Sequence, residues 1–113
     1  MANTFVNKKV DLTTTSATTL YTVPSATTAI IKSILVSEDS GNADTITVTI
    51  TDTSDAIFSL FKTKYISANA TTELLTAPLV LQQNEALKVT AATATRLHVI
   101  LSALQSKPRE VIT

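Results

Sequence analysis

The sequence predicts an all-β protein, an antiparallel β-sandwich of the jelly-roll or immunoglobulin-like kind with about eight short strands and extended termini. Threonine makes up about a fifth of the 113 residues, and β-branched residues suit a pleated surface and resist a helix. Segments that alternate apolar and polar residues recur about every ten residues, separated by turn-forming residues. No segment has convincing helical periodicity, so the pattern favours a sandwich built from strands alone.

The clearest predicted strand covers residues 44–52, where apolar and polar side chains alternate without a break. Ile46, Val48 and Ile50 share one face, because successive side chains of a strand point to opposite sides of the sheet. The threonines between them share the other face. Residues 30–36 are more continuously apolar and predict a more deeply buried strand.

A hairpin of residues 30–36 and 44–52 is expected at the centre of the fold, joined by the turn at 38–43. Gly41 and Asn42 in this turn are residues that tolerate a positive φ angle. The remaining strands, apart from one uncertain segment, are expected at residues 5–12, 19–23, 71–75, 79–81, 86–91 and 97–104. The last two of these are expected to form a closing hairpin.

Local signals place several of these elements. The lysines of residues 5–12 discourage further pairing, so this strand is expected at a sheet edge. Pro24 ends the strand that precedes it. Residues 56–66 leave two alternatives, because their first apolar residues fit the stripe of a short helix while the rest continue with a period of two. No helix-stop signal follows, which favours a strand.

Residues 1–113 are expected to form one domain. The sandwich core is expected to cover about residues 5–104, and residues 105–113 to leave it as a C-terminal arm. This last stretch is polar, is interrupted by Pro108 and ends in an apolar hook. A flexible tail and an arm that docks on an adjacent subunit both fit it.

The composition excludes several classes of function. The chain has nine basic and nine acidic residues, so it lacks the positive field on which non-specific nucleic-acid binding relies. It has no cysteine for a disulfide, a thiol nucleophile or a cysteine metal site. No signal peptide or membrane-spanning run is recognisable, so we expect no membrane partner. Aromatic residues are few, and only Tyr21 and Tyr65 could offer polar-tipped rings for a sugar or a base.

No motif supports catalysis or a cofactor. His98 is the only histidine, and it lies in a predicted apolar strand without a zinc-site partner or a nucleophile motif, so a structural or interface role is expected. A gathering of His98 with two carboxylates in a pocket would revive an enzyme hypothesis. Gly41 stands alone, so there is no glycine-rich phosphate loop. We expect no catalytic, cofactor-binding or metal-binding residues and no enzymatic activity.

Two acidic turns and one glycosylation motif are not interpreted as functional sites. The first turn contains Glu38, Asp39 and Asp44, and the second contains Asp52 and Asp55. Neither has calcium-loop spacing, and a strand of about eight residues, roughly 25 Å, separates them, so solvated carboxylates are expected. Asn69 begins an acceptor motif for glycosylation, but without a secretory signal a chance match is expected in a threonine-rich chain.

Three segments carry a resemblance to a known group of proteins, namely residues 20–36, 43–48 and 78–91. In their order they resemble small β-sandwich virion proteins of tailed bacteriophages, which include capsid decoration or cement-like proteins and other head or tail accessories. The resemblance covers most of residues 10 to 104. Such proteins usually have glycine where this chain has Ala26 and Asn84, which leaves the geometry of those two turns in question.

The resemblance implies a structural virion protein, most specifically a capsid decoration protein that stabilises a phage head by bridging subunits. The implied partners are the major capsid protein or other virion proteins, with a homo-oligomer, guessed to be a trimer, assembled into the virion in the host cytoplasm. The expected interface residues are Phe5 and Val6 as an N-terminal anchor and Pro108, Val111 and Ile112 in the C-terminal arm. Deletion of residues 107–113 is expected to abolish incorporation into particles.

Two alternatives remain open at this point. The chain could be a tail, neck or fibre-base component of the phage, which copy number would distinguish from a decoration protein. It could also be a receptor- or glycan-binding module, for which aromatic side chains on a loop face would be the sign. The aromatic-poor sequence disfavours the second alternative.

Overall fold

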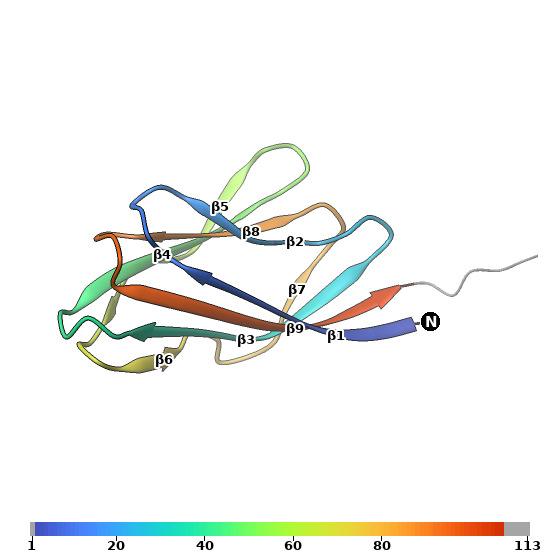
Figure 1. The fold of residues 1–113 in the computed structure, drawn as a ribbon. Helices are drawn as coiled ribbons and strands as arrows, with labels where there is room; N and C mark the ends of the chain where they lie inside the picture. Colours follow the sequence, from blue (N-terminus) through green and yellow to red (C-terminus); the bar gives the residue numbers. More distant parts are fainter. Residues whose placement is uncertain (1, 108–113) are drawn as a thin grey trace, which may run out of the picture.

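The structure, a computed structural model, describes residues 2–107 and confirms an all-β sandwich. Two antiparallel sheets pack face to face, as the ribbon in Figure 1 shows. The described residues form nine strands, one more than expected, and no helix. They accordingly contain no helix that could cross a membrane.

Sheet A has the strand order β1-β9-β3, with β6 and β7 both paired to the far side of β3. β6 pairs with the end of β3 near Ser37, and β7 pairs with its beginning near Ile30. The strands are β1 (Ala2–Asp11), β3 (Thr28–Glu38), β6 (Thr71–Glu73), β7 (Leu79–Leu81) and β9 (Leu97–Lys107). β1 forms one edge of sheet A, as its lysines predicted.

Sheet B has the order β2-β8-β4-β5. Its strands are β2 (Thr18–Thr22), β4 (Asp44–Thr51), β5 (Ile57–Ile66) and β8 (Ala86–Ala91). Most connections pass from one sheet to the other, and β4–β5 is the one pair of consecutive strands that is hydrogen-bonded within residues 2–107. This alternation favours the jelly-roll alternative, because consecutive strands commonly pair in an immunoglobulin-like sandwich.

The core lies between the sheets and is built from the alternating residues of four central strands. On β4 every second residue, beginning with Asp44, is buried, which confirms the alternation in the sequence. The fully enclosed apolar side chains of these strands are Ile31, Ile34, Val36, Ile46, Val48, Leu87, Val89, Leu97, Val99 and Leu101. Removing this apolar surface from water is the main stabilising contribution to such a sandwich.

The two expected hairpins are wrong. β3 lies in sheet A and β4 in sheet B, so the turn at 38–43 carries the chain across the sandwich instead of pairing the two strands. β8 and β9 are separated in the same way. β3 pairs with β9, and β4 pairs with β8, so the four strands do form the centre of the fold. A period of two identifies the buried face of a strand but not its neighbour.

The uncertain segment is a strand, since β5 covers Ile57–Ile66. Its pairing with β4 is interrupted by two register shifts, and Thr63 lies at one of them with a φ of 49°. Such bulges twist an edge strand and discourage pairing with another chain. At the C-terminal end, β9 continues to Lys107, past the point where the sequence analysis ended the strand, and Lys107 pairs with Ala2.

The two positions at which the virion proteins that this sequence resembles usually have glycine both adopt the left-handed conformation. Ala26 has a φ of 55° and Asn84 a φ of 63°. The turns that hold them touch: the Ala26 N–H donates to Gln83 Oε1 at 2.8 Å, and Ser25 Oγ donates to Asn84 Oδ1 at 3.2 Å. The turn geometry that glycine would serve is therefore kept without glycine.

Candidate interaction surfaces

The outer face of sheet A carries apolar side chains in rows that run across the strands. One row joins Phe5, Leu104, Ile30 and Val80, from β1, β9, β3 and β7. Phe5 is 79% exposed and Val80 is 53% exposed, while the two between them are half-buried. A monomeric soluble protein rarely leaves neighbouring large apolar side chains uncovered, so this row is a candidate contact surface.

A second row lies four residues along β9 and has charged ends. It joins Lys9, Ile100, Leu35 and Glu73, from β1, β9, β3 and β6. Ile100 and Leu35 are each 36% exposed. Glu73 is held in place because its carboxylate accepts hydrogen bonds from the Ser33 hydroxyl and from the N–H groups of Ile34 and Leu75.

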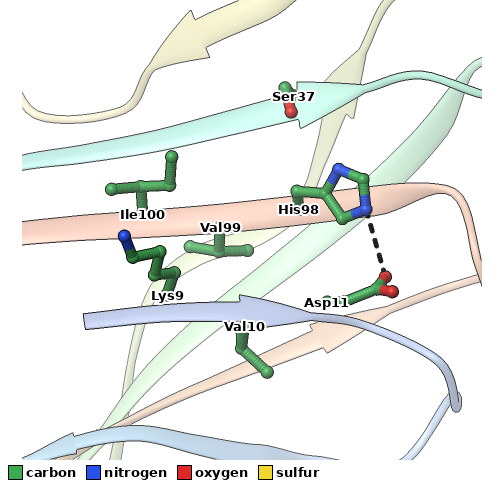
Figure 2. Close-up of a pocket in the computed structure, with 7 residues that line it drawn as sticks. All are labelled: Lys9, Val10, Asp11, Ser37, His98, Val99 and Ile100. Atoms are coloured by element: carbon green, nitrogen blue, oxygen red, sulfur yellow. Dashed lines mark ion pairs between the residues drawn. The ribbon is translucent and has the colours of Figure 1, made fainter.

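His98 lies at one end of this same face and not inside the apolar core. Its Nε2 is 3.3 Å from Asp11 Oδ1, and its Nδ1 is 3.6 Å from Asp39 Oδ2. Its side chain is 40% exposed. Figure 2 shows the imidazole lying over the sheet, with Asp11 beside it on β1 and Ser37 across from it on β3. These residues line a hollow of about 470 Å³ together with Lys9 and Ile100.

The structure therefore places His98 beside two carboxylates, which is the arrangement that an enzyme hypothesis requires. Both ring nitrogens face a carboxylate, and no hydrogen bond joins Ser37 Oγ to the ring. A histidine that activates a serine needs one nitrogen free to accept the hydroxyl proton. This histidine instead links β1 to the loop after β3 across the end of β9. No group of three or more His, Asp or Glu side chains in residues 2–107 is arranged to hold a metal.

A second apolar surface lies where the sandwich opens beside β5. A cleft of about 260 Å³ separates β5 from the segment that joins β6 to β7, and its walls include Phe61, Leu75 and Pro78. Next to it, Ile57 and Phe58 are 69% and 55% exposed. Tyr65 is also exposed on β5, farther along the strand toward its end at Ile66. Tyr21 is buried, and its hydroxyl accepts a hydrogen bond from Gln105 Nε2.

The expectation of solvated carboxylates in the first acidic turn is wrong for Glu38 and Asp44, which are both buried. Glu38 Oε2 accepts hydrogen bonds from the N–H and the hydroxyl of Ser40. Its Oε1 accepts from the N–H groups of Gly41 and Asn69, at 3.0 and 3.1 Å. The carboxylate therefore ties the β3–β4 loop to the β5–β6 turn, so Asn69 contributes its backbone to the fold. Asp39 remains exposed, beside His98.

The pKa of Glu38 is set by two opposing causes. Burial alone would raise it, because a charged carboxylate loses solvation. The hydrogen bonds from Ser40, Asn69 and Gly41 favour the charged form and prevail, lowering the pKa from its ordinary value of 4.5 to about 2. Glu38 is therefore a charged structural residue of the loop end.

The expected interface residues are placed in part. Phe5 lies on the outer face of sheet A with its ring exposed, and Val6, the next residue, points the other way and packs against the core. The N-terminal anchor thus reduces to Phe5, since Val6 is half-buried in its own chain. Pro108, Val111 and Ile112 lie outside the described residues.

Comparisons with known proteins give one structural likeness. No protein-family model matches the chain. No curated protein matches it either. Among solved structures, a chain of the cyanophage Pam1 capsid asymmetric unit is similar, with 20% sequence identity over 94% of this chain and 85% of that chain. The TM-score is 0.43. A structural similarity with this TM-score supports no conclusion about function.

The sequence alone did not reveal the rows on the outer face. Phe5, Ile30 and Val80 are far apart along the chain, and each alone has an ordinary apolar place in an alternating strand. Only the strand order and register bring them together. The one available signal was the apolar character of both faces in residues 97–104, which pointed to a central strand and not to an exposed face.

Proposed function

We propose that this chain is a structural protein of a phage virion, and specifically a capsid decoration protein that bridges subunits of the head. Support comes from the sequence resemblance and from the surfaces of this chain, and not from the weakly similar capsid chain. The observation that carries the proposal is the exposed apolar row on the outer face of sheet A, headed by Phe5. Such a surface serves contact with neighbouring molecules better than it serves chemistry.

Decoration would stabilise the particle by mass action. A protein that binds only the assembled shell shifts the equilibrium away from disassembly. In this proposal the outer face supplies an apolar contact and residues 108–113 supply an arm that holds a neighbouring subunit. The partners are the major capsid protein or other virion proteins. A trimer is the oligomer that the resemblance implies.

The test compares incorporation of variants into particles assembled without the native chain. Deletion of residues 108–113 should leave the sandwich folded and reduce occupancy in co-sedimented particles at least tenfold. The deletion begins after Lys107, because this residue is still paired with Ala2 in sheet A. Phe5→Asp should also reduce occupancy, because it places a charge in the apolar row.

Thr53→Asp is the matched control, since it adds a charge at an exposed turn of sheet B. It should bind particles as the native chain does. Full occupancy of both the truncated protein and Phe5→Asp would contradict the proposed contacts. Failure of the native chain to bind any particle would contradict the virion role itself.

A further inference from the structure

We propose that the outer face of sheet A binds the same face of a second copy of this chain, around a twofold axis parallel to the strands. The axis would lie between β9 and β3, the two central strands of the face. The rotation exchanges β9 with β3 of the second copy, and β1 with β6 and β7. This inference concerns the purified chain in solution and can be tested without any particle. The proposed virion contact uses the same face, so a second copy and a virion subunit would compete for it.

The chemistry of the rows is what identifies a second copy as the partner. The charged row runs from Lys9 through two apolar side chains to Glu73, so the rotation places Lys9 opposite Glu73 of the second copy. Neither of these two residues forms an ion pair within the described residues. The same rotation places Ile100 opposite Leu35. The rotation reverses the order of this row in the second copy, and the row is complementary to its reversed copy.

The apolar row behaves in the same way. It is apolar from one end to the other, so its reversal places Leu104 opposite Ile30 and Phe5 opposite Val80. Between the two rows lie Ser102 and Ser33, which are small and would allow close approach.

The remaining charges of the face meet neutral groups in this arrangement. His98 would face Ser37, and Asp11 would face Thr71. Lys32, which occupies the extra position in β3, would lie near Ser102. No like charges are opposed, and a self-pairing surface requires such self-complementarity, because both copies present the same residues.

The size of the face fits a weak or moderate dimer. Four strands and the span from His98 to Ser106 give a footprint of roughly 19 by 27 Å, from the usual strand spacings. Burial on two copies is then about 1,000 Å², at the lower limit for a specific interface. Sheets that pack face to face cross at about −30°. At this angle the residue pairs between β9 and β3 of the two copies, which lie nearest the twofold axis, still face each other. We therefore expect dissociation in the micromolar range.

Sedimentation velocity of the full chain over about 1 to 300 µM tests the inference. The native protein should shift with concentration from its monomer mass of 12.0 kDa to twice that mass. Ile100→Glu and Leu35→Lys should each weaken the dimer at least about tenfold, because each buries a charge against an apolar side chain. Circular dichroism and thermal unfolding would verify that both variants fold.

Mixing the two variants gives the decisive result. In a mixed dimer the introduced Glu faces the introduced Lys once, and the native Leu35 faces the native Ile100 once. The mixture should therefore form dimers at concentrations at which each variant alone is monomeric. Ile57→Glu is the control and should leave dimerisation unchanged, because it introduces the same charge at an exposed apolar site on β5, in the other sheet. A native protein that stays monomeric, a trimer that ignores these substitutions, or a mixture that does not re-form dimers would overturn the inference.

Discussion

Single residues in this protein hold conformations that their side chains disfavour. Ala26 has a φ of 55°, in a region that costs an L-residue roughly 1 kcal/mol and costs glycine almost nothing. The virion proteins that this sequence resembles usually have glycine at this position. The structure supplies the reason, since the turn needs the left-handed conformation whichever residue occupies it.

Ala26→Gly should therefore stabilise the protein by up to about 0.5 kcal/mol, because the larger freedom of glycine in the unfolded chain offsets much of the strain relief. Urea unfolding followed by circular dichroism measures the difference. Ala92→Gly is the matched control at an exposed position with no positive φ, and it should destabilise the protein slightly. A lower unfolding midpoint for Ala26→Gly than for the native chain would contradict this account of the turn.

Glu38 makes stability depend on pH. Its pKa is about 2 in the folded protein, against an ordinary 4.5, so the folded state favours the charged form. The stabilisation is fully present above about pH 4.5 and is lost as the pH falls toward 2. The native protein should therefore exceed Glu38→Gln in unfolding free energy at pH 6, and the gap should narrow steadily between pH 4.5 and 2.

Thermal unfolding of the two proteins from pH 6 to 2 would measure this gap. Asp55→Asn provides a comparison, because the Asp55 side chain accepts no hydrogen bond in the described residues. A difference between the native protein and Glu38→Gln that stays constant over this range would show that Glu38 does not act through its charge.

At the scale of the elements, the sequence predicted strands well and their partners poorly. Alternation in residues 44–52 identified the buried face of β4, because burial on one side imposes a period of two. It could not say that the turn at 38–43 crosses to the other sheet. That outcome depends on Glu38, whose buried carboxylate binds this loop and the distant β5–β6 turn together. In the sequence, a glutamate three residues before Gly41 is indistinguishable from an ordinary exposed turn residue.

At the scale of the whole molecule, the candidate surfaces form because strand order and strand register bring distant residues side by side. Phe5, which the sequence analysis proposed as an anchor, has its ring exposed on the outer face of sheet A, and its role as an anchor stays a prediction. Its neighbours on this face could not be predicted, since Leu104, Ile30 and Val80 join it only through three strand pairings. His98 likewise meets Asp11 and Asp39 only through the fold, and its side chain is 40% exposed at the end of the outer face.

The molecule as a whole is a two-sheet sandwich (Figure 1). Among its described residues, exposed apolar side chains gather at two places, the outer face of sheet A and the cleft beside β5. A subunit that joins a repeated assembly needs several such surfaces, since each neighbour occupies one.

The proposed virion role is tested most directly by counting this chain in intact phage particles, by quantitative mass spectrometry of purified virions together with their imaging. The account predicts hundreds of copies on the surface of the head, as a decoration protein on a symmetric shell requires. Absence of the chain from the particles, or a count of a few dozen confined to the tail or neck, would contradict it.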